Sequence, residues 1–385
     1  MIAAFAEAHG ERLWKQWAPL ATSGSGPQYA RSGLLAVVLG TAAALAVKVP
    51  VVFGIDPVSA PEAYFRNAPW LVLLFLALYF ALTRRPGPGR SALAVSAIAV
   101  CAIAINLYPW QPESMTGVLT TLHLPVMLWL LIGLIHAGPR WRNPDARMDF
   151  IRFSGEWAIY FLLIGLGGGL LIAFSAALFN ALAIDIEYWI ESWILPCGAA
   201  GAVLIATWLV EAKQQVIENM APVLTRLFSP LFTVVLLSFL VVAIASDRTI
   251  QGDREVLILF DFVLIVVLAL VLYSISARDP ASRPGLFDHL QWLLILAALA
   301  SDLLALTAIV SRIGDYGLSP NRVAGLGLNL LLLGNLAGSA WLYGRFIRGR
   351  SGFADLEAWQ TGWLPVFGAW CAFVALVFPL LFGFV

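Results

Sequence analysis

The stretch VLILFDFVLIVVLALVLYSIS, residues Val256–Ser276, decides the fold class of this chain. It contains one charged residue, Asp261, in an otherwise almost wholly apolar sequence. About 20 consecutive apolar residues, coiled into an α-helix, cross the hydrocarbon core of a bilayer. We therefore predict a transmembrane helix here, and the next question is how often such stretches recur.

The composition of the whole chain points the same way. Of its 385 residues, 61% are hydrophobic and only 12% are charged, and the mean hydropathy is +0.86. A soluble domain usually carries about 25% charged residues. The formal net charge is zero, which argues against nucleic acid as a partner. Membrane lipids are the partner that this composition predicts.

Apolar stretches of similar length recur along the chain, and we count eleven. The predicted spanning helices lie at residues 33–53, 66–83, 92–109, 116–137, 157–182, 189–211, 229–246, 256–276, 290–311, 323–344 and 363–383. They make residues 33–385 a single transmembrane helical domain of an all-α polytopic membrane protein. For residues 1–32 we predict a cytoplasmic interfacial amphipathic helix followed by a flexible linker.

The orientation follows from the distribution of Lys and Arg between the two sets of predicted loops. The set that contains the N-terminus holds 17 of these residues, and the opposite set holds five. Positively charged loops remain in the cytoplasm. We therefore predict a cytoplasmic N-terminus and an outer C-terminus at Val385.

Polar side chains inside the predicted helices gather in the outer half of the membrane. At about 1.5 Å of rise per residue, Lys48, Asp261 and His123 lie roughly 7–10 Å below the outer surface, and Asn329 is also in this half. Asp302 is deeper, near the middle of its helix. A buried charge costs at least ~2.5–3.5 kcal/mol. The pattern predicts either an outward-facing polar cavity or separate, individually satisfied groups.

Asp302 cannot easily reach the membrane surface, so it should hold a proton or lie beside a cation. Lys48 is the candidate partner within the membrane. Arg312 is ten residues further along the same helix, about 15 Å away, which is too far for direct contact along a regular helix. His123 has no Cys, Asp or Glu at metal-ligand spacing, so we predict a structural histidine and no metal site.

The loop SRIGDYGLSPNR, residues 311–322, contains two of the five outward arginines. Gly314 or Gly317 should end the preceding helix, and Ser319 should cap the next one, with a proline in its first turn. One hypothesis pairs Asp315 with Arg322 to brace the turn. The other places Arg312 or Arg322 at the mouth of the cavity, where it would attract an anionic substrate or lipid headgroup.

The sequence contains no matched set of catalytic residues, no cofactor motif and no cysteine spacing typical of a metal or redox site. Two glycine motifs, GLGGGLL at 165–171 and GNLAG at 334–338, are typical of close helix packing. The residues that we predict to contact a substrate or coupling ion are Asp302, Asp261, Lys48, Arg312, Arg322, His123 and Asn329.

Four stretches resemble a family of bacterial inner-membrane proteins catalogued as domain of unknown function 4153. They are RFSGEW at 152–157, PVLTRLFSPLF at 222–232, RIGDYGLSPNR at 312–322 and the terminal VFPLLFGFV. The resemblance covers roughly residues 145–385. It implies a polytopic protein of the bacterial inner membrane, and it brings no substrate, cofactor or catalytic residue.

Three functions remain open from the sequence. We favour a transporter or permease for a small solute or ion, because charges are buried and no soluble domain is present. A structural, assembly or regulatory membrane subunit is the second possibility. The third is an enzyme that acts at the outer face on lipid-linked envelope substrates, with the outward acids and arginines in its site.

Overall fold

The computed structural model describes residues 27–212, 220–245 and 254–385. These ranges contain helices and no strand. The predicted interfacial helix at the N-terminus lies outside the described residues. The elements, in chain order, are α2 (Pro27–Ala46), α3 (Val49–Val52), α4 (Pro61–Arg84), α5 (Pro88–Leu107), α6 (Met115–Ala137), η1 (Gly138–Arg140), α7 (Pro144–Ala181), α8 (Glu187–Trp189), the π-helical turn η2 (Ile190–Ile194), α9 (Leu195–Ala212), α11 (Met220–Ala245), α12 (Arg254–Ser276), α13 (Leu286–Tyr316), α14 (Pro320–Ile347), α15 (Ala354–Ala372), the π-helical turn η3 (Phe373–Val377) and α16 (Phe378–Leu381).

Within the described residues, eleven helices are long and apolar enough to cross a membrane, which confirms the predicted number and the all-α class. The fifth differs most from its prediction, because α7 begins at Pro144 rather than near residue 157. Asn143 caps it, and its first turns bury apolar side chains such as Met148 and Phe153. Charged residues on the other face of these turns lower the local hydropathy, so the sequence analysis did not predict these turns as part of the helix.

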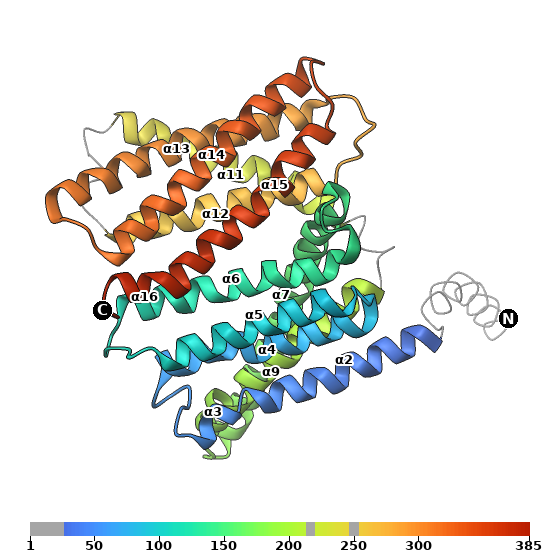
Figure 1. The fold of residues 1–385 in the computed structure, drawn as a ribbon, viewed down its shortest axis with the longest axis vertical. Helices are drawn as coiled ribbons and strands as arrows, with labels where there is room; N and C mark the ends of the chain where they lie inside the picture. The colour runs from blue at the N-terminus through green and yellow to red at the C-terminus, as the bar shows by residue number, and fades with distance from the viewer. Residues whose placement is uncertain (1–26, 213–219, 246–253) are drawn as a thin grey trace.

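The described loops lie at two opposite ends of the helix bundle (Figure 1). The basic end carries the loops 85–87, 138–143, 277–285 and 348–353. The Tyr316 end carries the loops 53–60, 108–114, 182–186 and 317–319, and it also holds Val385. The sequence assigned the same loops to the same two sets. Which end faces the cytoplasm stays a prediction.

The helices pack into two groups, each with its own apolar core. Lobe 1 consists of α2, α4, α5, α6, α7 and α9, with Leu76, Leu128 and Leu204 fully buried in its core. Lobe 2 consists of α11, α12, α13, α14 and α15 and is centred on Leu264 and Leu336. The first turns of α7 and the helix α15 contact both lobes and form the seam between them.

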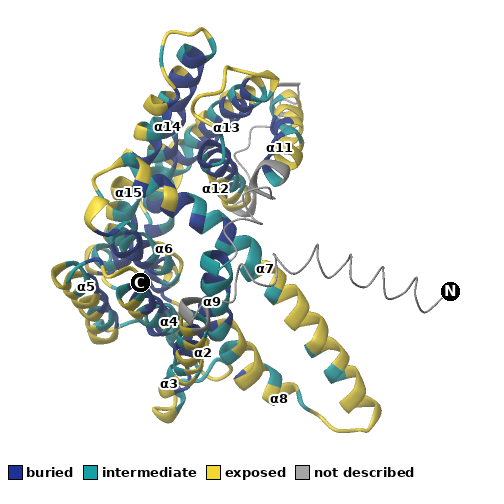
Figure 2. Ribbon diagram, turned by 90° about the vertical axis from the view of Figure 1, so that its right-hand side faces the viewer, coloured by how far each residue is buried: buried dark blue, intermediate teal, exposed yellow. Residues whose placement is uncertain are grey.

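The two glycine motifs behave differently. In GNLAG, a Cβ on Gly338 would lie 2.0 Å from the ring of Trp359, so α14 and α15 approach closely through these residues. In GLGGGLL, a Cβ on any of the four glycines would meet nothing within 4 Å. The second half of α7 extends away from the bundle with exposed side chains (Figure 2). The prediction of close packing is therefore confirmed for GNLAG and wrong for GLGGGLL within this chain.

Candidate functional site

Three of the predicted residues meet in lobe 2, where α12, α13 and α14 pack together. Asn329 of α14 donates its Nδ2 hydrogens to Asp261 Oδ1 of α12 and to the carbonyl oxygen of Gly325, both at 2.8 Å. Asp302 of α13 is fully buried and lies about 10 Å deeper than Asp261. The site thus contains two carboxyl groups on neighbouring helices, Asp261 and the deeper Asp302, which we call the carboxyl pair. Asn329 binds the shallower of the two.

Asp302 lacks the hydrogen bonds that normally accompany a buried carboxyl group. Neither Oδ1 nor Oδ2 has a hydrogen-bond partner. Two further buried oxygens, Ser301 Oγ and Asn329 Oδ1, are also without a partner. An ionised carboxylate without a partner is very costly in a low-dielectric interior. Asp302 must therefore hold a proton or a cation.

The three residues form a series that deepens from the Tyr316 end. At about 1.5 Å per residue, Asp261 lies about 10 Å from the start of α12, and Asn329 about 14 Å from the start of α14. Asp302 lies about 21 Å from the end of α13. Asp261 is half-buried, whereas Asn329 and Asp302 are fully buried. Asp261 is thus the carboxyl group through which a proton or cation from the surface could reach Asp302.

Gly325 of α14 lies beside Asp261, with room for no more than a methyl group in ordinary contact. A Cβ on Gly325 would lie 3.6 Å from Asp261 Oδ2 and 3.7 Å from Ile309 Cδ1, which is ordinary van der Waals contact. A larger side chain at this position would press directly on the carboxylate.

Lys48 does not pair with Asp302, so that prediction is wrong. Its Nζ donates a hydrogen bond to the carbonyl oxygen of Ser192 in η2, and it lies 4.3 Å from the centre of the Trp193 ring. Lys48 therefore joins α2 to the start of α9 within lobe 1. The sequence did not reveal which helices neighbour one another, and depth alone suggested the wrong partner.

The contact of Lys48 has a physical cause in Pro196. In an α-helix, the N–H of residue 196 would bond the carbonyl four residues earlier, which is that of Ser192. Proline has no N–H, and the chain forms the π-helical turn η2 at this point. The ammonium of Lys48 supplies the missing donor. We conclude that Lys48 is a structural residue.

Of the other predicted residues, His123 and Arg322 are occupied locally. His123 of α6 has its Nδ1 atom 2.8 Å from the carbonyl oxygen of Leu119, one turn away in the same helix. Arg322 donates from Nη1 to the carbonyls of Tyr316 and Gly317, at 2.9 and 2.7 Å. Arg312 is half-buried, and its Nη1 has no hydrogen-bond partner.

In the loop between α13 and α14, the helix-terminating and helix-capping residues are as predicted, but the contact that stabilises the loop is different. Gly317 ends α13 with a φ of 75°, a left-handed value that glycine adopts without strain. Ser319 caps α14 by accepting a hydrogen bond from the N–H of Arg322. The predicted pair between Asp315 and Arg322 is wrong, because Arg322 instead caps the carbonyls that α13 leaves open.

Sequence reasoning missed a second polar cluster in lobe 2. Asn335 donates to Gln360 Oε1 at 2.9 Å, and Gln360 donates to Ser339 Oγ at 2.7 Å. All three are fully buried between α14 and α15. Gln360 was missed because the last span was predicted to begin at residue 363, which placed it in a loop. Its two side-chain hydrogen bonds indicate a structural role.

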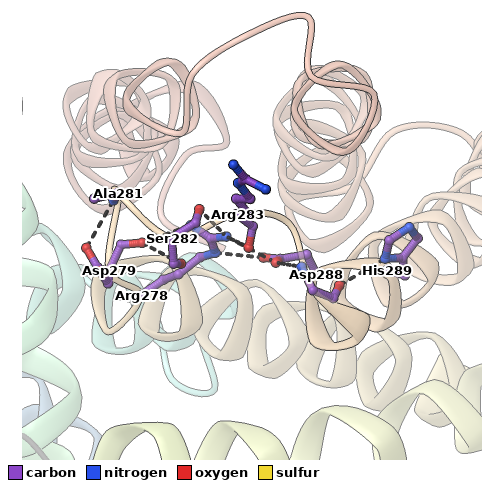
Figure 3. Close-up of polar contacts among 8 residues, drawn as sticks. Arg278, Asp279, Ala281, Ser282, Arg283, Asp288 and His289 are labelled. Atoms are coloured by element: carbon purple, nitrogen blue, oxygen red, sulfur yellow. Dashed lines mark hydrogen bonds and ion pairs between the residues drawn. The ribbon is translucent and has the colours of Figure 1, made fainter.

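The basic end of lobe 2 is held by Arg278 (Figure 3). Its guanidinium donates to both carboxylate oxygens of Asp288, at 2.8 and 3.1 Å. It lies 4.7 and 4.5 Å from the rings of Phe346 and Phe353. Three carbonyls of the loop 277–285 accept further hydrogen bonds from it. Arg278 is therefore occupied in holding this loop against α14.

Among the described residues of the Tyr316 end, Asp56, Arg66 and Arg322 each have separate local contacts. Asp56 accepts hydrogen bonds from Ser59 and Val58 within its own turn. These bonds, that from the Ser59 hydroxyl first, hold the pKa of Asp56 below its ordinary value. Arg66 lies 4.3 Å from the centre of the Trp110 ring, and Arg322 caps α13. These three residues therefore do not form a shared site.

The fold and the buried carboxyl pair define the chain as a multi-pass α-helical membrane protein. Among the described residues, no group of three or more His, Cys, Asp or Glu side chains is placed to hold a metal ion. No family model, curated protein or solved structure matched the chain when it was compared with them. Its function is therefore argued from the geometry of the site.

Proposed function

We propose that this protein is a transporter or permease for a small solute or ion, and that Asp302 carries the coupling proton or cation. The observation that carries the proposal is the complete burial of Asp302 without a hydrogen bond to either oxygen. We place the protein in a bacterial inner membrane, with the basic end cytoplasmic and Val385 outside. The resemblance to domain of unknown function 4153 supports that location, and we propose membership of that family.

The absence of partners is what favours transport over a structural role. A carboxyl group that only joined helices would be stabilised by donors, because a buried acceptor without one costs about 1–3 kcal/mol and a charge costs more. Asp302 has no such donor, so it can gain or release a proton or cation without breaking a hydrogen bond. Ionisable groups inside membrane helices commonly form the ion pathways of transporters.

The position of the pair also suits transport. Asp261 is half-buried on the side nearer the Tyr316 end, so it can receive an ion before Asp302 does. The helices that carry Asp261 and Asn329, α12 and α14, also contact α7 and α6 of lobe 1. Movement of one lobe against the other would therefore change the surroundings of the carboxyl pair, as alternating access requires.

The test uses purified protein in liposomes that contain a pH-sensitive dye. The vesicles are exposed to a panel of amino acids, organic acids, sugars and monovalent cations. We expect at least one solute to produce a pH change with the wild-type chain, and we expect Asp302→Asn to abolish it. Asp315→Asn is the matched control, because it removes the same charge from an exposed position on the same helix.

Two results would contradict the proposal. A full response in the Asp302→Asn variant would show that this carboxyl group does not couple transport. A wild-type protein that moves no proton with any solute, in either direction of the gradient, would argue against proton-coupled transport of those solute classes. Monovalent cations on both sides of the membrane are varied separately, so that cation coupling is distinguished from proton coupling.

A further inference from the structure

The seam between the lobes contains an apolar groove at the basic end. It has a volume of about 300 Å³ and is lined by α6, the first turns of α7 and the middle of α15. Leu130 and Leu134 form its α6 wall, Phe150 its α7 wall and Leu364 its α15 wall. From the first to the last lining residue on α6, it extends about 15 Å along the helix axis.

Its lining is polar only where it reaches the basic end. Trp141 and Arg147 line the groove there, at the start of α7. Arg147 Nε is buried and has no hydrogen-bond partner. Tryptophan at this depth is typical of the boundary between hydrocarbon and headgroups. The groove thus combines an apolar channel with one cationic side chain at its end, whose Nε atom has no hydrogen-bond partner.

We infer that this groove binds an anionic glycerophospholipid, with one acyl chain along α6 and the phosphate on Arg147. The groove is apolar along its length and cationic only at one end, which matches an acyl chain that ends in a phosphate. An apolar helix of a partner would leave Arg147 without an anion. An acyl chain is the slender apolar occupant that a membrane supplies. The guanidinium matches the charge and the geometry of a phosphate.

Two glycines determine how the groove can be altered. A Cβ on Gly133 would lie 2.7 Å from the Phe150 ring, so this position tolerates no side chain without movement of the ring. A Cβ on Gly368 would lie 3.7 Å from Leu130 Cδ1, which is an ordinary contact. Gly368→Ala should therefore leave the groove open, and Gly368→Phe should fill it.

The test measures phosphatidylglycerol bound to the full-length protein by native mass spectrometry after purification in detergent. We expect the wild-type chain and Gly368→Ala to retain one lipid, and Gly368→Phe to lose it. Arg147→Gln should bind roughly tenfold more weakly, because a charge-assisted hydrogen bond is lost. Arg350→Gln is the control, since it removes an exposed charge at the same end outside the groove.

Wild-type binding by Gly368→Phe would overturn the inference, as would equal weakening by Arg147→Gln and Arg350→Gln. Displacement of the lipid by inorganic phosphate alone would show that Arg147 binds a free anion rather than a lipid, and would also overturn it. If Gly368→Phe does not fold, Leu134→Phe narrows the groove from α6 and provides the same comparison. The proposal does not depend on Asp302, so transport assays leave it unaffected.

Discussion

Lys48 in lobe 1 and Asp302 in lobe 2 are both charged side chains buried inside spanning helices, at 8% and 0% exposure. Lys48 donates to a carbonyl that Pro196 leaves without its α-helical donor, and it also lies against Trp193. Asp302 has no hydrogen bond at all. The comparison teaches that two charged residues at similar depth can differ in their partners. We propose that the presence or absence of a partner separates the structural charge from the functional one.

A second proline, at the start of α16 beside α6, also leaves a carbonyl that a side chain from another helix satisfies. Pro379 cannot donate to the carbonyl of Ala375, and the chain again forms a π-helical turn, η3. The hydroxyl of Thr120 donates to that carbonyl at 2.9 Å. Tyr108 donates to the next carbonyl, that of Leu376. Each of these prolines is therefore accompanied by a polar side chain from another helix, and such side chains are structural.

The largest effect on stability is expected for Lys48→Met, which keeps the apolar stem and removes the ammonium. The Ser192 carbonyl loses its donor, so we expect a loss of about 2–3 kcal/mol in the free energy of unfolding. Equilibrium unfolding in mixed detergent micelles measures it. In a Pro196→Ala background, a backbone N–H becomes available to the same carbonyl, and the cost of Lys48→Met should fall below about 1 kcal/mol.

Additive effects of Lys48→Met and Pro196→Ala would contradict this explanation. They would mean that the lysine stabilises the fold through Trp193 or through its charge alone, and that the proline has no part in it.

A smaller effect is expected for Thr120→Val, which keeps the shape of the side chain and removes its hydroxyl. The carbonyl of Ala375 then lacks a donor, and we expect a loss of about 1 kcal/mol in the same unfolding measurement. Thr120→Ser keeps the hydroxyl and should cost less. Equal losses in the two variants would show that packing of the Thr120 methyl, rather than the hydrogen bond, stabilises the contact with η3.

The spans were predictable because each is a local property of the sequence. Length and hydropathy identified eleven helices, and turn chemistry identified Gly317 and Ser319 at the ends of α13 and α14. The start of α7 was missed, since its apolar residues occupy only one face and charged residues share its first turns. A window average cannot distinguish such a helix from a polar loop.

The site was predictable only in part, because it depends on which helices are neighbours. Asp261, Asp302 and Asn329 were each identified by their depth. The fold joins Asp261 to Asn329 and places Asp302 on a helix that packs beside both. Their depth did not indicate that Lys48 belongs to the other lobe. The partner of Lys48 could have been inferred from Pro196, because a proline inside a spanning helix leaves a carbonyl that some donor must satisfy.

The smallest effect on stability, within about 0.5 kcal/mol, is expected for Asp302→Asn. No hydrogen bond is lost and the volume of the side chain hardly changes. The same variant should lose coupled transport while its free energy of unfolding hardly changes. Lys48→Met, in contrast, should lower the free energy of unfolding. A loss near 2 kcal/mol in the unfolding measurement would mean that Asp302 holds the helices together, and the distinction between the two buried charges would fail.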